Sequence, residues 1–329
     1  MRGTMALEDG TGVDFAELRT ARRRRVLDAM AAAEVDLLLL GRQGNARYVA
    51  GHRPIWRAVA TPWAPFAALR ADGGVHLLHT TWDDGVPDEI PHEHLTGLSW
   101  NPRVIVGDIA GLPGLADAKR LATDGMSSGL AMLLGALAKE AELADGEALM
   151  RSVRATKLPA EVECLRTSIA LTEGALTAAA AEIGPDVEPS RLKGAFHEAM
   201  GRYGLSHPHD EGSFGVGHPI AEGDLVPLSG ALAFAGYEPA VGRSRWCGPA
   251  ASNVQDEWAE AMAALVDRCR VGAEPPAGVH GVGLGIETLV GPLEAGMTLG
   301  VPLTVGGYVG ADTVLVTEQG PERLTRLSA

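Results

Sequence analysis

Along the first half of the chain, the spacing of apolar residues switches between a helical and an extended period. Residues 14–33 show a helical stripe, and residues 35–41 (VDLLLLG) read as a buried strand ended by glycine. Residues 66–78 are typical of a hairpin, with Asp72-Gly73 at its turn. A further strand and loop are expected over 101–114, and a mainly helical stretch over 127–146. This alternation predicts an α/β domain. The stripe residues are Phe15, Leu18, Val26, Leu27 and Met30.

The second half begins with a long helical pattern. Pro159 suits a first helical turn, and Gly184-Pro185 stops the helix. Further helices are predicted over 189–203 and 255–270, and the remainder is glycine-rich strand and turn. The chain therefore divides into two predicted domains, residues 1–148 and 149–329.

Composition narrows the function classes. The 329 residues are 46% hydrophobic and 21% charged, which is typical of globular proteins. The net charge of −14 argues against nucleic acid or an anionic membrane as a partner. The three cysteines form no CxxC pair, which indicates reduced thiols. The N-terminus does not resemble a signal peptide, and apolar runs are too short to span a bilayer, so we expect a cytoplasmic protein.

Four segments carry a resemblance, in this order: EGDLVPLSGALAFAGYEPAVGRSRWCG (222–248), HGVGLG (280–285), LEAGMTLGVPL (293–303) and YVGADTVLVTEQGPERLT (308–325). Together they resemble the creatinase, aminopeptidase P and Xaa-Pro dipeptidase family. The resemblance covers nearly the whole chain. It implies a small creatinase-like α/β domain followed by a pita-bread α+β domain. The family's helix before His280 is replaced by VGAEPPAGVH, so the second domain is trimmed.

Metal-dependent members of this family hold two divalent ions with two Asp, one His and two Glu. The resemblance places Ser229, Ala240, Pro302 and Ala311 at the four carboxylate positions, and only the histidine is kept, as His280. One imidazole cannot form a dinuclear shell. We therefore expect no metal ligands and no cofactor.

Creatinases catalyse without metal, with a histidine as general base. Their histidine turn is matched by GVGHPIAEGDLV, which nominates His218 as the base; a surface histidine in a turn is the equal alternative. His280 is a second candidate, for contact with substrate or an oxyanion. Glu287 stands where peptidase members carry another histidine, and could orient His280 or act as an acid; a solvated glutamate is the simpler interpretation.

The residues expected to bind the substrate indicate a small molecule that carries a carboxylate. Arg243 and Arg245 (GRSRW) are cations beside the expected pocket, although outward-facing strand arginines are as consistent with the pattern. Tyr237 and Ser229 complete this expected binding set. Cys247 is a minor nucleophile candidate, because neighbouring arginines lower a thiol pKa; a buried, inert cysteine is the favoured alternative.

Assembly is a further implication of the resemblance, since related enzymes form dimers in which one accessory domain covers the neighbouring site. Residues 50–63 match the covering segment, which nominates Arg53 or Trp56 for the neighbouring cleft of a homodimer; a loop folded back on its own domain is the alternative. Three functions stay open: a metal-independent hydrolase or lyase with a His base, a non-catalytic pseudo-peptidase that binds a ligand or protein, and, least favoured, a metallopeptidase.

Overall fold

The computed structural model describes residues 12–52, 65–80, 85–125, 127–204 and 212–328. The chain divides into two compact units, Met1–Arg154 and Ala155–Ala329. The boundary expected at 148/149 falls inside the helix that ends the first unit. Within the described residues, no helix is both long and apolar enough to cross a membrane.

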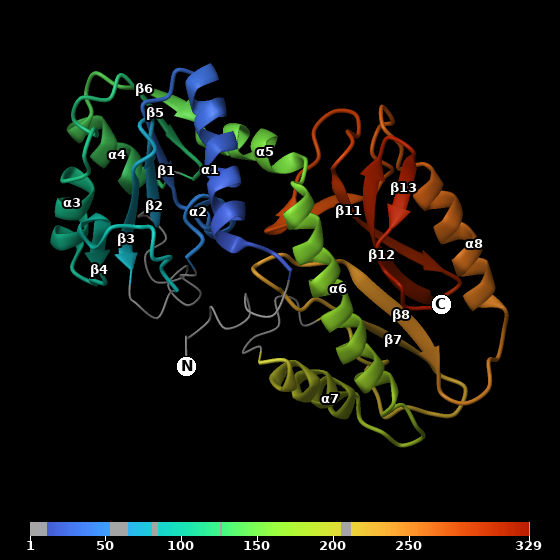
Figure 1. Ribbon diagram of the computed structural model, residues 1–329. Helices are drawn as coiled ribbons and strands as arrows, with labels where there is room; N and C mark the ends of the chain where they lie inside the picture. Colours follow the sequence, from blue (N-terminus) through green and yellow to red (C-terminus); the bar gives the residue numbers. More distant parts are fainter. Residues whose placement is uncertain (1–11, 53–64, 81–84, 126, 205–211, 329) are drawn as a thin grey trace. The chain divides into compact units, whose positions relative to one another are not determined.

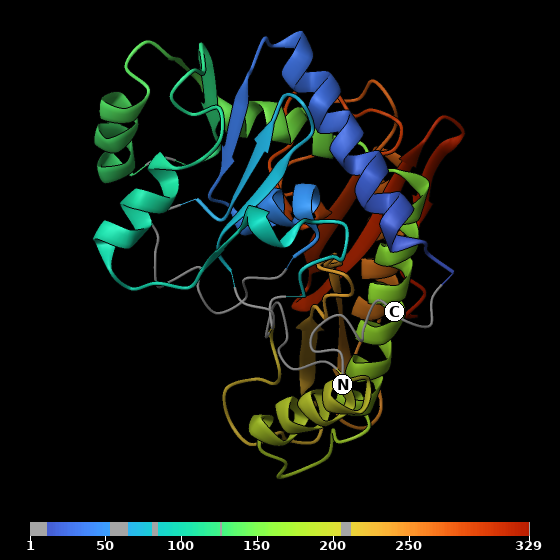
Figure 2. The same cartoon turned by 60° about the vertical axis from the view of Figure 1, so that its left-hand side comes forward.

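The first unit is built on a six-stranded mixed sheet of order β4-β3-β2-β1-β5-β6 (Figure 1). Strands β1, β5 and β6 run parallel, and β2 is antiparallel to both of its neighbours. Figure 2 shows α1 (Phe15–Ala32) on one side of this sheet and α3 (Pro102–Ala110) and α4 (Ser128–Leu137) on the other. The strands are β1 (Leu37–Leu40), β2 (Ala67–Arg70), β3 (Val75–Thr80), β4 (Leu95–Gly97), β5 (Arg120–Thr123) and β6 (Glu142–Asp145).

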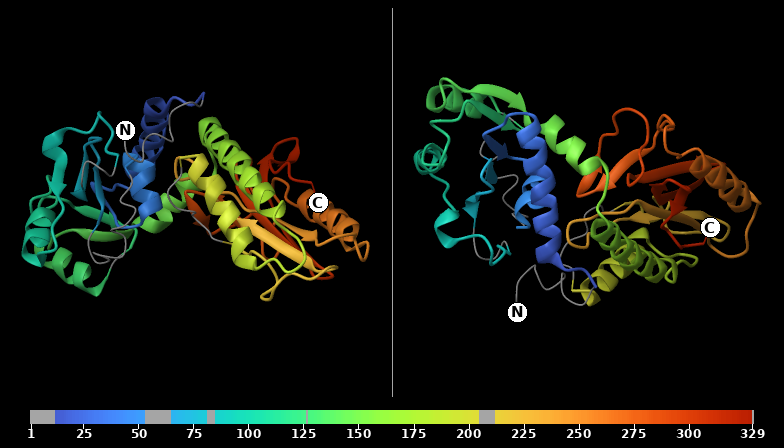
Figure 3. Two further views of the ribbon diagram at one scale, coloured as in Figure 1. Left: turned by 90° about the horizontal axis from the view of Figure 1, so that it is seen from below. Right: turned by 45° about the horizontal axis from the view of Figure 1, so that its top comes forward.

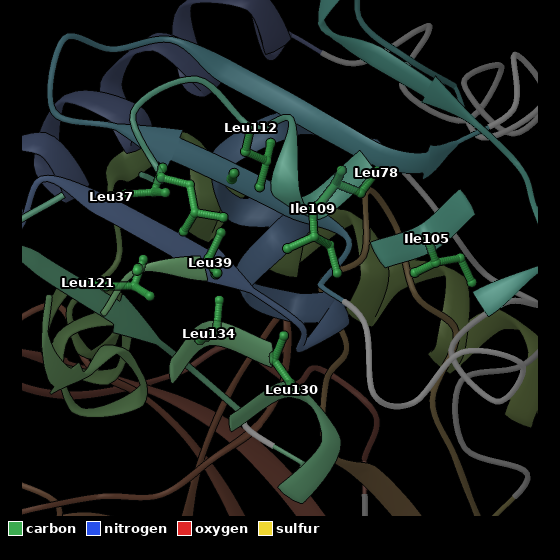
Figure 4. Packing of buried hydrophobic residues seen from close by; sticks show 12 residues of the cluster. Leu37, Leu39, Leu78, Ile105, Ile109, Leu112, Leu121, Leu130 and Leu134 are labelled. Atoms are coloured by element: carbon green, nitrogen blue, oxygen red, sulfur yellow. The ribbon is translucent and has the colours of Figure 1, made fainter. Parts of the chain in front are cut away.

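The core of this unit follows from strand alternation. Leu37 and Leu39 of β1 point to the same face of the sheet, where they pack with Ile105 and Ile109 of α3 and with Leu134 of α4 (Figure 4). The remaining helices are α2 (Gln43–Ala50), the short 3-10 helix η3 (His92–His94) and α5 (Gly146–Ala155).

Two sequence-based element predictions were wrong. The expected strand over 101–114 is helix α3, because Asn101 caps it by accepting a hydrogen bond from the backbone N–H of Arg103 and Pro102 starts its first turn. Ile105 and Ile109 are then four residues apart on one buried helix face. The expected helix over 127–146 ends at Leu137, and β6 follows as the edge strand of the sheet.

The second unit has a seven-stranded antiparallel sheet of order β10-β9-β11-β12-β8-β7, with β13 paired to β12. Trp258 and Met262 of α8 (Val254–Asp267) pack on the face of β11 and β12 that carries Leu299, Val301 and Val314. The strands are β7 (Leu225–Gly230), β8 (Val241–Trp246), β9 (His280–Gly283), β10 (Gly285–Glu287), β11 (Thr298–Val305), β12 (Tyr308–Thr317) and β13 (Gly320–Arg323).

Helices α6 (Pro159–Ala180) and α7 (Pro189–Arg202) lie side by side in this unit (Figure 3). As expected, α6 begins at Pro159; the Glu161 carboxylate accepts a hydrogen bond from the backbone N–H of Leu158 at 2.8 Å. Residues 268–279, between α8 and β9, contain turns and no helix, which agrees with the trimming expected from the sequence.

Candidate functional site

A row of four residues crosses four neighbouring strands of the second sheet. Ser229 of β7 pairs with Gly242 of β8, Gly242 with Ala311 of β12, and Ala311 with Pro302 of β11. Residues directly opposite one another on paired strands point to the same face. The structure therefore brings together three of the four positions at which the resemblance expects carboxylates. We call these four residues the cross-strand row.

His280 and Ala240 lie on the same face as the cross-strand row. His280 pairs with Gly300 on β11, and a Cβ placed on Gly300 would lie 2.6 Å from His280 Nε2 and 3.0 Å from Ala240 Cβ. The imidazole therefore lies over Gly300, and a larger residue at position 300 would clash with both His280 and Ala240. Among the described residues, no protein group hydrogen-bonds to the ring.

The cross-strand row, Ala240, His280, Gly300 and Thr313 together form what we call the His280 face. Thr313 belongs here because it is opposite Gly300, and its hydroxyl bonds to both the N–H and the C=O of Ala240. The Ser229 hydroxyl accepts a hydrogen bond from the Ser213 N–H at 3.0 Å.

These residues do not fit the two metal ions that the fold implies. Divalent ions in such centres need several converging carboxylate or imidazole donors. The His280 face offers one imidazole and two hydroxyls that are already hydrogen-bonded. Across the described part of the chain, no group of three or more His, Cys, Asp or Glu side chains is placed to hold a metal.

Arg243 lies on the opposite face of the sheet. Its guanidinium is 2.6 Å from the Asp312 carboxylate, donates to the carbonyl of Leu327, and stacks 4.8 Å from the ring centroid of Trp258. Both partners of the ion pair are almost fully buried. Because successive residues of a strand alternate between faces, Arg243 cannot reach the side that carries Gly242 and His280. This placement gives no support to the expected role of Arg243 in binding a substrate carboxylate.

The side chains of Arg245 and Tyr237 also form their hydrogen bonds with groups outside the His280 face. Arg245 shares its strand face with Arg243 and donates to the backbone carbonyl of Ser328 at 2.8 Å. Tyr237 is fully buried, and its hydroxyl donates to the carboxylate of Glu161 at the start of α6. Of the substrate-binding residues expected in the described part of the second unit, Ser229 alone lies on the same face of the sheet as His280, and three strands separate the two.

His218 is exposed at the other end of β7. Its Nδ1 is 2.8 Å from the carbonyl of Pro219 and 3.9 Å from the Asp224 carboxylate. Phe214 pairs with Leu228 beside β7, so the segment leading to His218 runs away from Ser229. Asp224 and Ser229 are five residues apart on extended chain, about 16 Å at 3.3 Å per residue. The structure does not bring His218 to the His280 face.

Glu287 forms a buried ion pair with Lys157. Its carboxylate is 2.5 Å from the lysine Nζ, and the two side chains are 11% and 2% exposed. Glu287 is opposite Gly281 on β9, which faces away from His280. The expectation that Glu287 orients His280 is not supported by this pairing. Nothing in the spacing of the sequence indicated Lys157 as its partner, because 130 residues separate them.

A pocket of about 490 Å³ lies in the segment that replaces the missing helix. Its walls are apolar or small apart from two carboxylates, one threonine and His280. The lining includes Glu274, Pro275, Pro276, Val279, His280, Glu287, Thr288 and Leu289.

Three candidate residues remain, Cys247, Arg53 and Trp56. Cys247 is buried, and burial, Glu222 and Asp224 raise the pKa of its thiol, which disfavours the nucleophilic thiolate. Arg53 and Trp56 lie outside the described residues, and their place in a neighbouring cleft stays a prediction.

We find no protein-family model and no curated protein that matches the sequence. Solved structures do match over nearly the full chain. The prolidase from Pyrococcus horikoshii OT3 is 17% identical, with a TM-score of 0.72 over 94% of this chain and 99% of that one. The Xaa-Pro dipeptidase from Bacillus anthracis is 17% identical, with a TM-score of 0.73 over 94% and 98%.

Aminopeptidase P from E. coli, solved with the inhibitor Pro-Leu, is 15% identical, with a TM-score of 0.70 over 97% of this chain and 96% of that one. At these identities the similarity defines the fold: a mixed α/β protein with the pita-bread architecture of prolidases. It does not carry their activity over to this chain.

Proposed function

We propose that this chain is a metal-independent ligand-binding protein on the fold of Xaa-Pro peptidases, and that it does not hydrolyse Xaa-Pro peptides. The observation that carries the proposal is the composition of the His280 face. Ser229, Ala240, Pro302 and Ala311 stand where the resemblance expects metal-binding carboxylates, and His280 is the one imidazole beside them among the described residues.

The loss of charge from this face has a direct chemical consequence. Hydrolysis of an amide by a dinuclear centre depends on a metal-activated water and on metal-polarised oxygen. Without donors to hold the ions, this chain has no group on the His280 face that supplies either function. What remains is a surface of small side chains with an accessible imidazole, which suits binding better than hydrolysis.

The proposal is tested by incubating the purified full chain with an Ala-Pro dipeptide, with and without added Mn²⁺ or Co²⁺, and measuring free proline. We expect no release above the uncatalysed rate under either condition. Metal-dependent release of proline that is lost in His280→Ala would overturn the proposal.

A second candidate is a metal-independent enzyme with a histidine general base acting on a small molecule. The observation that favours it is the partly exposed ring of His280, to which no group of the described residues hydrogen-bonds. General-base catalysis by His280 predicts turnover that falls by about a hundredfold or more in His280→Ala. The same turnover should survive in His218→Ala, because His218 is exposed at the far end of β7.

A further inference from the structure

The pocket beside His280 is bounded by a proline-rich loop that is anchored at both ends. Before the loop, the backbone of residues 272–273 exchanges two hydrogen bonds with that of Leu293, a buried core residue. After the loop, His280 begins β9 and joins the sheet. Two consecutive prolines, at positions 275 and 276, restrict the backbone between these anchors. A restrained loop loses little conformational freedom when a ligand binds, so this wall of the pocket is pre-formed.

The opposite wall comes from the chain that follows β10, the edge strand of the sheet. The Leu289 side chain lies against β9, since a Cβ on Gly281 would be 3.3 Å from its Cδ2. Leu289 and Val279 both pack against the apolar cluster that contains Leu293. No residue of the cross-strand row lines the pocket, which therefore lies at the edge of the sheet. Its volume of about 490 Å³ and its aliphatic walls suit a small organic molecule.

The pocket carries one surplus negative charge. Of its two carboxylates, that of Glu287 is 2.5 Å from the Lys157 ammonium, which neutralises it. The other, that of Glu274, is exposed and forms no ion pair within the described part of the chain. The described residues that line the pocket include no lysine and no arginine. A singly charged cation is therefore the ligand that matches this lining electrostatically.

An organic cation fits these donors better than a metal ion does. A divalent ion needs several donors that converge on one point. His280 and the two glutamates line one pocket, yet no group of three or more such side chains in the described ranges is placed to hold a metal. An ammonium group needs only one carboxylate, and its hydrocarbon part uses the aliphatic walls.

Resting on the proposed function, we propose that this pocket binds a small aliphatic ammonium ion. Its N–H groups donate to the Glu274 carboxylate, and its hydrocarbon part lies against Val279 and Leu289. A carboxylate-bearing molecule, which the sequence led us to expect, would meet Glu274 with no cation in the described lining to offset the repulsion. The lining has no Phe, Tyr or Trp, so a quaternary ammonium would lack both N–H donors and the cation–π contacts that usually hold it.

Four probes that share one cyclohexyl ring test the proposal: cyclohexylmethylammonium, its N-trimethylated form, cyclohexylmethanol and cyclohexanecarboxylate. Each is titrated without metal into the full-length protein with isotope-labelled histidine. The titrations are made at pH 8, above the usual range of imidazoles and below that of alkylammonium groups. The ring resonance of His280, which lines the pocket, is assigned from its absence in His280→Asn.

We expect saturable shifts of the His280 resonance with cyclohexylmethylammonium, at an affinity at least about threefold higher than for cyclohexylmethanol, because an exposed ion pair contributes up to about 1 kcal/mol. The trimethylated probe should bind more weakly than the primary ammonium, and the carboxylate should bind weakest. The absence of a His280 shift with the primary ammonium would overturn the proposal. Equal or tighter binding of any of the other three probes would overturn it too.

A matched pair of variants separates the pocket from the general attraction of a chain with a net charge of −14 for cations. Glu274→Gln keeps the shape of the side chain, removes its charge and should abolish the preference for the ammonium over the alcohol. Glu260→Gln removes the same charge at an exposed position of α8 and should leave that preference unchanged. A preference that persists in Glu274→Gln, or is lost equally in both variants, would contradict the role of Glu274.

Failure of this inference is distinguishable from failure of the proposed function. The probe titrations contain no metal and no peptide, and they report on one pocket. Metal-dependent release of proline in the dipeptide assay would defeat the proposed function, whichever probe the pocket prefers.

Discussion

The guanidinium of Arg243 lies 2.6 Å from the carboxylate of Asp312, with both side chains almost inaccessible to solvent. Because side chains alternate between the two faces along a strand, this pair shows on which face the neighbouring residues of β8 and β12 lie. Gly242 and Ala311, their chain neighbours, consequently lie together on the His280 face. The ion pair is thus part of the scaffold behind the candidate site.

Removing one partner of this pair should be strongly destabilising. Asp312→Ala leaves the Arg243 charge buried without its carboxylate and should lower the free energy of unfolding by about 3–5 kcal/mol. Glu322→Ala removes an exposed pair with Arg166 and should cost less than about 1 kcal/mol. Urea denaturation of both variants makes the comparison. Equal losses would contradict the buried placement of Arg243.

His76 should make the stability of the first unit depend on pH. Burial, followed by His94 and Arg70, lowers the pKa of His76 in the folded protein, while Asp72 opposes this. Its ring stacks on His94 at 4.1 Å. Since the unfolded chain binds the proton more readily, stability should fall as the pH drops below about 6.5, the usual histidine pKa. The loss levels off below the folded pKa.

Thermal unfolding between pH 7.5 and pH 5.5 checks this prediction. His76→Gln should lose less stability over this range than the wild-type protein. His92→Gln, which changes an exposed histidine of η3, should follow the wild type. A His76→Gln profile that matches the wild type would show that the acid sensitivity arises elsewhere.

Two glycines of the first unit should respond in opposite directions to alanine. A Cβ at Gly146 would lie 2.7 Å from the backbone carbon of Thr123, so Gly146→Ala should destabilise by about 1–3 kcal/mol. Gly135 of α4 has nothing within 4 Å, and alanine there should add about 0.5–1 kcal/mol through helix propensity. Chemical denaturation measures both, and a destabilised Gly135→Ala would be inconsistent with an open helix surface.

Assembly stays a prediction from the resemblance. We expect a homodimer at micromolar concentration, measured by sedimentation, and a weaker one in Trp56→Ala because large aromatic side chains anchor interfaces. A monomer in the wild-type protein would contradict it.

The sequence predicted most of the helices and the fold because those features depend on local patterns. The apolar stripe before residue 33, the Asp72-Gly73 turn and Pro159 each act within a few residues. Helix α3 was missed because its β-branched Val-Ile-Val run favours a strand. The Asn101 cap and the four-residue spacing of Ile105 and Ile109 stabilise a helix instead.

The candidate site was less predictable because its residues are joined across strands. The order of the motifs located the cross-strand row and His280, yet the direction of each strand side chain depends on register. Arg243 and Arg245 lie close to the row in sequence and point to the other face. The Lys157–Glu287 pair links two segments far apart along the chain, and no local signal revealed it.

Restoring the carboxylates should restore metal binding. A protein with Ser229→Asp, Ala240→Asp, Pro302→Glu and Ala311→Glu crowds four acidic groups onto one face, so without metal it should be less stable than the wild type. Added Mn²⁺ should raise its melting temperature, with no such rise when His280→Ala is included. A melting temperature insensitive to Mn²⁺ would contradict the assignment of these positions.

The metal content of the wild-type protein tests the central claim most directly. The full chain is incubated with Mn²⁺ or Co²⁺, freed of unbound ion by gel filtration and measured by elemental analysis, with the restored variant as positive control. The account predicts no stoichiometric metal in the wild-type protein and retained metal in the control. Stoichiometric metal in the wild type that disappears in His280→Ala would contradict it.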